Sequence, residues 1–168
     1  MINIIKYLSF KIKTLTKEEM KVSKEELISM MRKFRDALNE KDLEKCLSFF
    51  TEDADWLNPH GEFKGKEELK KYLKWGFEVS PDQKVIESGV KIIAEEDKAV
   101  YEHILEGSFE ETKYKVLALC IYEFKGDKFQ HLRTTYDRLS MAKQLAKGPV
   151  AKTAVNSIIN RMEKGLKQ

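Results

Sequence analysis

The sequence predicts an α+β protein in which helices come first, antiparallel strands follow, and helices return at the end. Apolar residues recur at three- and four-residue spacing between residues 23 and 77, which indicates amphipathic helices. Four strand-like segments occupy residues 84–94, 99–109, 113–125 and 128–137. The links between them are too short for crossover helices, so these strands run antiparallel in sequence order. We therefore expect one domain with helices packed on one face of a sheet.

The first helix has the clearest start signal. Ser23 followed by Glu26 forms a capping box, in which each side chain satisfies a free backbone donor of the other residue. An apolar stripe follows and predicts a helix that ends near Asn39. Asp42 is the expected N-cap of a second, shorter helix that reaches Phe50. A third helix is expected after Gly65.

The segment from Phe49 to Gly61 joins the helices to the strands and combines polar groups with large aromatic residues. Residues 54–57 suit a short strand, and residues 58–61 have turn chemistry because of Pro59 and Gly61. We interpret this segment as the floor of a small-molecule cavity.

The two ends of the chain extend beyond this domain. Residues 1–22 form an N-terminal extension, residues 23–147 the domain, and residues 148–168 a C-terminal amphipathic helix. The N-terminal extension is either a helix packed on the domain or a tail. Gly148-Pro149 breaks the helical pattern before the last helix. That helix suits packing on the domain, a lid over the cavity, or a contact with a partner.

Composition excludes several classes of function. The net charge of the 168 residues is only +3, which is small for a nucleic-acid-binding protein. No apolar run approaches the roughly 20 residues that span a bilayer, and the opening residues make a poor signal peptide. Cys46 and Cys120 lack metal-ligand spacing, and the three histidines lie on separate elements. We expect a soluble cytoplasmic protein with no metal and no cofactor.

Two stretches of the chain resemble a known family. Residues 34–73 (FRDALNEKDLEKCLSFFTEDADWLNPHGEFKGKEELKKYL) are similar to the N-terminal half of the SnoaL-like branch of the nuclear transport factor 2-like superfamily. Residues 100–109 (VYEHILEGSF) and 115–145 (KVLALCIYEFKGDKFQHLRTTYDRLSMAKQL) are similar to the second half. The resemblance implies a cone-shaped α+β barrel, with a curved antiparallel sheet wrapped around the N-terminal helices and a deep pocket. It also implies a homodimer formed through the outer face of the sheet.

The same superfamily contains the ketosteroid isomerases, whose catalytic groups are absent here. Those enzymes use a carboxylate base just before the Pro of the turn, and a Tyr and a carboxylic acid as an oxyanion hole. The corresponding positions are Asn58, Phe34 and Cys120. An amide cannot abstract a proton, and Phe and Cys are not strong hydrogen-bond donors. We therefore expect no steroid-type isomerisation by that mechanism.

Strand alternation combined with the resemblance predicts which side chains face the pocket. They form an aromatic wall with few polar groups, as a small-ligand site requires. The predicted ligand-binding residues are Phe34, Trp56, Asn58, Tyr72, Tyr101, His103, Ala118, Cys120, Tyr122, Leu132, Thr134 and Tyr136.

His103 is the main catalytic candidate, because a pocket histidine can act as a general base. Asn58 and Asp53 are the other candidates. Arg133 and Asp137 resemble the charge pairs of related epoxide hydrolases, although strand alternation places them on the outer face.

Three functions stay open. The chain is a pocket protein for a small apolar or aromatic ligand, or a lyase or isomerase that uses His103, or a non-catalytic dimeric scaffold. Structural and binding roles of the same side chains fit all three, so the sequence alone does not separate them.

Overall fold

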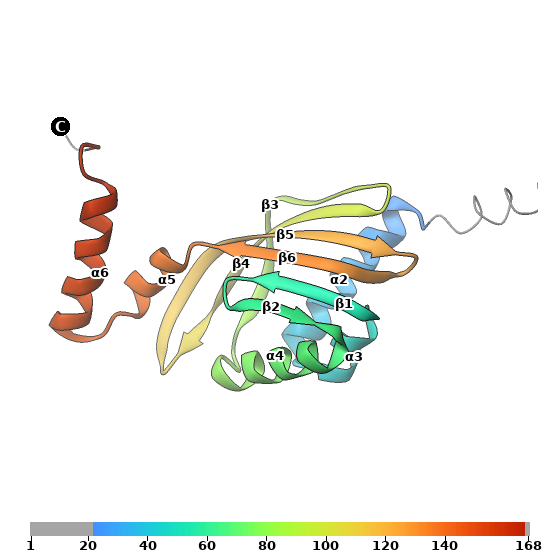
Figure 1. Cartoon of the computed structure of the whole chain (residues 1–168), viewed down its shortest axis with the longest axis horizontal. Coiled ribbons are helices and arrows are strands. Elements are labelled where there is room, and N and C mark those ends of the chain that lie inside the picture. Colours follow the sequence, from blue (N-terminus) through green and yellow to red (C-terminus); the bar gives the residue numbers. More distant parts are fainter. Residues whose placement is uncertain (1–21, 167–168) are drawn as a thin grey trace, which may run out of the picture.

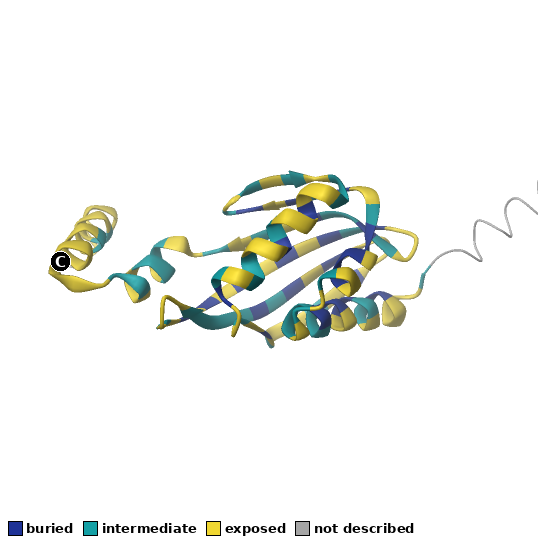
Figure 2. Ribbon diagram, turned by 90° about the horizontal axis from the view of Figure 1, so that it is seen from below, coloured by how far each residue is buried: buried dark blue, intermediate teal, exposed yellow. Residues whose placement is uncertain are grey.

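The structure, a computed structural model, describes residues 22–166 and confirms the α+β fold. Helices α2 (Lys24–Glu40), α3 (Leu43–Ser48) and α4 (Gly65–Val79) lie on one face of a curved six-stranded sheet, as Figures 1 and 2 show. The expected N-terminal extension lies, apart from Val22, outside the described residues.

The helix start signals of the sequence form as predicted. Glu26 N donates to Ser23 Oγ at 3.2 Å, and Ser23 N donates to Glu26 Oε2 at 2.8 Å, which completes the capping box of α2. Asp42 caps α3 by accepting from Lys45 N. Helix α3 ends at Ser48, however, and Phe50 begins a strand. Phe50 fits both the apolar stripe of a helix and an inward position of a strand. Spacing alone could not separate the two, and the sequence prediction placed Phe50 in the helix.

The sheet contains strands β1 (Phe50–Asn58), β2 (Gly61–Lys64), β3 (Lys84–Glu95), β4 (Lys98–Phe109), β5 (Thr112–Lys125) and β6 (Lys128–Tyr136). Their order is β2-β1-β6-β5-β4-β3. Strands β3 to β6 form the predicted antiparallel meander. Strand β2 was not predicted, because its four residues directly follow the turn at Pro59 and His60.

One pairing corrects the expectation of a wholly antiparallel sheet. Strand β1 pairs with β6 in parallel, with Trp56 opposite Leu132 and Leu57 opposite Arg133. The short-link argument applied only to consecutive strands, whereas β1 and β6 are separated by α4 and the whole meander. Parallel pairing is permitted over such a distance in sequence. The sheet is mixed and its edges β2 and β3 do not pair, so the barrel is open.

The core lies between the concave face of the sheet and α2, α3 and α4. Phe34 of α2 is 1% exposed and meets the rings of Phe50 and Phe129 edge-on, with centroids 5.4 and 5.0 Å apart. Such aromatic contacts stabilise the fold in addition to the burial of their area. Leu69 and Leu73 anchor α4 on the same core. The helices cover only part of the concave face, and a cavity is left beside them.

The C-terminal region leaves the sheet. Helix α5 (Arg138–Leu145) follows β6 and reaches the open end of the cone, and α6 (Gly148–Met162) stands beyond it (Figure 1). Helix α6 has no buried residue and is mostly exposed in Figure 2, and its exposed apolar side chains include Ile158 at 52% and Met162 at 71%. Helix α6 therefore does not pack on the domain core, which was one of the roles expected for it. None of the helices within residues 22–166 is long and apolar enough to cross a membrane.

Candidate functional site

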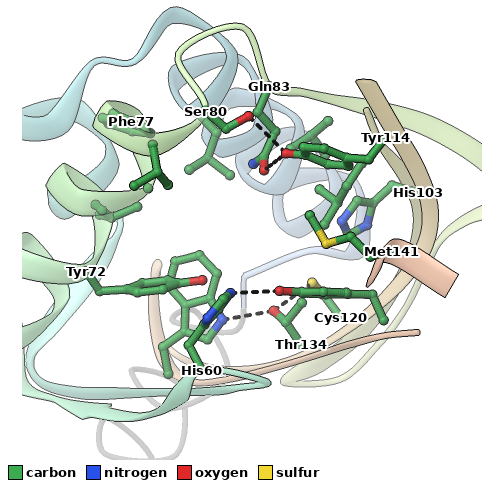
Figure 3. A pocket seen from close by; sticks show the side chains of 18 of the residues that line it. His60, Tyr72, Phe77, Ser80, Gln83, His103, Tyr114, Cys120, Thr134 and Met141 are labelled. Carbon is green, nitrogen blue, oxygen red and sulfur yellow. Dashed lines mark hydrogen bonds between the residues drawn. The ribbon is translucent and has the colours of Figure 1, made fainter. Parts of the chain in front are cut away.

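The concave side of the sheet contains a cavity of about 430 Å³. Three walls enclose it: α2 and α4 on one side, strands β4 to β6 on the other, and α5 at one end. Figure 3 shows side chains from these elements pointing into a common space. The lining is mainly aromatic and aliphatic, with polar groups gathered in a few places.

Most of the predicted ligand-binding residues lie on this cavity. The lining includes these nine: Phe34, Trp56, Tyr72, Tyr101, His103, Cys120, Tyr122, Thr134 and Tyr136. Strand alternation brings the sheet residues together, because Tyr101 pairs with Cys120 and Cys120 with Thr134 in the strand register.

Four predicted residues do not line the cavity. Ala118 and Leu132 are buried in the domain but are not part of the cavity lining, and Asp53 is exposed. Asn58 is buried below the turn, where its Oδ1 accepts from His60 N at 2.8 Å. That bond fixes the turn, as Asn side chains commonly do.

At the mouth, His60 and Tyr136 form a polar pair. Tyr136 Oη lies 2.8 Å from His60 Nε2, and the His60 ring contacts Trp75 with centroids 4.9 Å apart. Burial and the nearby Arg138 guanidinium lower the pKa of His60. Arg138 itself donates to the carbonyl oxygen of Pro59 at 2.8 Å and so joins α5 to the turn.

In the centre, Thr134 connects two other lining residues. Its hydroxyl accepts from Trp56 Nε1 at 2.9 Å and lies 3.1 Å from Cys120 Sγ. Burial raises the pKa of the Cys120 thiol to about 12, so this cysteine stays a neutral thiol and is not an activated nucleophile.

At the opposite wall, Ser80, Gln83 and Tyr114 form a group that sequence reasoning missed. Tyr114 Oη donates to Gln83 Oε1 at 2.6 Å and lies 3.0 Å from Ser80 Oγ (Figure 3). Tyr114 has the same strand parity as Cys120, and that signal could have found it. Ser80 and Gln83 belong to the link between α4 and β3, where the sequence showed only a turn.

Gly107 explains how that link reaches the cavity. It pairs with Tyr114 in the strand register, and a Cβ at this position would lie 2.8 Å from Gln83 Cα and 2.9 Å from Ser80 Oγ. The lack of a side chain lets the link lie directly on β4. Asp82 then accepts from both Ser108 N and Ser108 Oγ at 2.8 Å, which holds the link in place.

His103 differs from the base that the sequence suggested. Burial lowers the pKa of His103 to about 4, partly offset by the backbone carbonyl of Tyr101. The ring is therefore neutral at pH 7, but it is a weaker base than a histidine with the usual pKa. Within residues 22–166 no carboxylate pairs with it. Asp53, another of the catalytic candidates, does not line the cavity.

Other charged groups take structural positions on the outside of the sheet. Arg133 pairs with Glu123, and Asp137 caps α5 by accepting from Leu139 N and Ser140 N, so Arg133 and Asp137 do not form the charge pair considered from the sequence. His131 Nδ1 lies 2.6 Å from Asp55 Oδ2 on the outer face. Among the residues that the structure describes, no three His, Cys, Asp or Glu side chains converge as metal ligands do.

A profile of the SnoaL-like domain matches residues 31–132. The chain belongs to the SnoaL-like domain family. The match runs from Met31 within α2 to Leu132 within β6, which includes most of the cavity walls. No curated protein matches the chain significantly.

Solved structures with the same fold show how widely it occurs. A protein with a ketosteroid isomerase-like fold from Catenulispora acidiphila, in complex with trimethylamine, matches with a TM-score of 0.64 at 14% identity, over 68% of this chain and 90% of that one. TerC, co-crystallised with polyporic acid, matches with a TM-score of 0.65 at 15% identity, over 73% of this chain and 99% of TerC. An NTF2-like protein from Burkholderia pseudomallei matches with a TM-score of 0.66 at 12% identity, over 73% of this chain and 98% of that protein. Identities this low establish the fold alone.

Proposed function

We propose that this SnoaL-like protein binds a small apolar or aromatic ligand in the cavity between α4, α5 and the sheet. The observation that carries the proposal is the cavity itself. Its volume of about 430 Å³ lies within the roughly 300–1,000 Å³ of small-molecule sites. Its walls combine aromatic rings with a few polar groups, which is the composition that binds and orients such ligands. Two structures of the same fold were determined with a small molecule, trimethylamine or polyporic acid.

The chemistry of the lining favours binding over catalysis. His103 has a strongly lowered pKa and no acidic partner among the described residues, and the Cys120 thiol is neutral. The residue before Pro59 is Asn58, whose side chain is an amide and does not line the cavity. A lyase or isomerase that uses His103 as its base has one point in its favour, since the ring is unprotonated and faces the cavity. The low basicity of that ring makes binding the better-supported function.

The binding function can be tested with N-phenyl-1-naphthylamine, a neutral dye that fluoresces in apolar sites. We expect saturable binding to the full chain. Ala142→Trp should weaken it at least tenfold, because Ala142 lines the cavity from α5 and a larger ring would fill the space. Ala151→Trp, on the exposed α6, is the matched control and should bind as the wild type does. Absence of saturable binding, or equal binding by Ala142→Trp, would contradict the proposal.

We further propose that the chain forms a homodimer through the outer face of its sheet. Apolar side chains on that face are partly exposed: Ile93, Val100, Leu117, Leu119 and Ile121, at 38–57%. Val100 is opposite Ile93 on one side and Ile121 on the other, so these residues form a continuous patch. Contiguous patches of this kind mark interaction surfaces. The Arg133–Glu123 pair beside the patch carries both signs of charge, so a second copy meets no net repulsion.

A further inference from the structure

The charges of the cavity lining are unbalanced. The lining includes Arg35 and Arg138, whereas no Asp or Glu among the described residues is part of it. Arg35 is compensated, because its Nε and Nη2 both donate to Asp36 Oδ1, at 2.9 and 2.7 Å. Arg138 makes no ion pair with a carboxylate within residues 22–166. The described lining therefore has one positive charge without a partner.

Arg138 is the first residue of α5 and is exposed at the mouth of the cavity. Its Nη1 donates to the carbonyl oxygen of Pro59 at 2.8 Å, which ties the guanidinium to the turn. Its Nε and Nη2 make no hydrogen bond to a described residue. These two N–H groups form an edge of the guanidinium that can bind a carboxylate through two parallel hydrogen bonds. One end of the group is thus held in place while this edge stays free.

The groups around Arg138 do not neutralise its charge. Asp137 is next to it in sequence, but that carboxylate accepts from two backbone N–H groups of α5 as the N-cap. Burial raises the pKa of Tyr136, and the Arg138 guanidinium opposes this effect. Burial lowers the pKa of His60, and Arg138 adds to the effect. Arg138 thus acts on the His60–Tyr136 pair, which offers hydrogen bonds but no negative charge.

We propose that the ligand is an organic acid whose apolar or aromatic body fills the cavity and whose carboxylate binds Arg138 at the mouth. The aromatic lining holds the body. Deep in the apolar cavity a carboxylate would lose its hydration without gaining a partner, whereas at the mouth it pairs with the guanidinium and stays partly in water. This inference rests on the proposed binding function and assigns the chemical class of its ligand.

Three naphthalene probes test the assignment by competition with N-phenyl-1-naphthylamine. The probes are 2-naphthoate, 2-naphthamide and the 2-naphthylmethylammonium ion, which share one ring system and carry a negative, no and a positive charge. In about 20 mM salt we expect 2-naphthoate to bind the wild type about fivefold more tightly than 2-naphthamide, as suits an ion pair at an exposed group, and the cation to bind most weakly. In about 0.5 M salt the advantage of 2-naphthoate should fall to about twofold or less, because salt screens an exposed pair.

Variants assign that preference to one side chain. In Arg138→Gln the advantage of 2-naphthoate over 2-naphthamide should fall to about twofold or less. Arg138→Lys should keep part of it, because lysine retains the charge but not the planar edge. Lys143→Gln removes the same charge from α5 outside the lining and should keep the full advantage. The ratio of the two probes within one variant reports the charge effect, since a change in the cavity as a whole alters both affinities. Circular dichroism establishes that each variant is folded.

The outcomes separate this inference from the function on which it rests. If neither the dye nor any naphthalene probe binds, the proposed function is wrong. If 2-naphthamide competes as well as 2-naphthoate against the wild type, the cavity binds ligands but the assignment of an acid is wrong. The assignment also fails if Arg138→Gln keeps the full advantage, or if Lys143→Gln loses as much of it as Arg138→Gln does.

Discussion

At the scale of single residues, the cavity is defined by which polar groups are paired and which are not. Thr134 satisfies Trp56, and Gln83 satisfies Tyr114, so these side chains fix the shape of the wall. His103 is different, because its ring is buried with no charged partner in the described part of the chain, and burial lowers its pKa to about 4. A group of this kind makes the stability of the protein depend on pH.

The first prediction concerns that dependence. The pKa of His103 in the folded protein lies below the unfolded value of 6.5, so its contribution to stability is fully present above pH 6.5 and is lost as the pH falls towards 4. The difference between the two values corresponds to about 3 kcal/mol of unfolding free energy. We expect the wild type to lose up to this amount more than His103→Leu between pH 7.5 and 4.

Urea denaturation at several pH values measures the effect, because comparison with the variant removes the contribution of the carboxylates that both proteins share. Parallel curves of stability against pH for the two proteins would mean that His103 stays accessible to protons in the folded state.

At the scale of elements, α5 acts as the end wall of the cavity although none of its residues is fully buried. Strand β6 is shorter than β5 and leaves the backbone of Lys115 without a strand on that side. Gln144 of α5 takes this place: its Oε1 accepts from Lys115 N at 2.8 Å, and its Nε2 donates to Lys115 O at 3.0 Å. One side chain therefore imitates a neighbouring strand and holds Met141, Ala142 and Leu145 over the cavity.

The second prediction follows from this contact. Gln144→Ala should raise the hydrogen-exchange rates of the α5 backbone amides about tenfold, because two hydrogen bonds of about 1 kcal/mol each hold the helix closed. The exchange rates of the α2 amides should not change. Lys143→Ala, an exposed neighbour on the same helix, is the control. Equal rates in the two variants would show that packing alone holds α5.

At the scale of the whole molecule, the sheet separates two apolar surfaces. Its concave face carries the core and the cavity, and its convex face carries the patch around Val100 and Ile121. Long side chains such as Ile and Leu at alternate positions are unusual on a face that stays in water. The family resemblance had suggested pairing through this face, and the patch supports the proposed homodimer.

The third prediction tests this pairing. Light scattering of the wild type at micromolar concentration should give twice the mass of the chain. Ile121→Lys should give a monomer, because it places a charge in the centre of the apolar patch. Ile158→Lys, on the exposed apolar side of α6, should leave the mass of the dimer unchanged. A monomeric wild type would contradict the proposal, and dimer loss in Ile158→Lys alone would move the interface to α6.

Some features of the site could be predicted from the sequence because they depend on local alternation. In a strand, the side chains of residues i and i+2 share a face, so assigning Cys120 inward also assigned Tyr122. Leu132 was assigned inward by the same rule and is buried, but it does not line the cavity. Parity predicts the face of a residue and not what lies in front of it.

The sequence by itself determined the helix caps, the antiparallel meander and the inward face of each long strand, because all of these depend on spacing over a few residues. Only the tertiary structure decided the parallel pairing of β1 with β6, the approach of Ser80 and Gln83 to Tyr114, and the burial of His103 at a place where no acid within residues 22–166 pairs with it. These features join segments that are distant in sequence, and their positions depend on how the whole sheet curves around the helices.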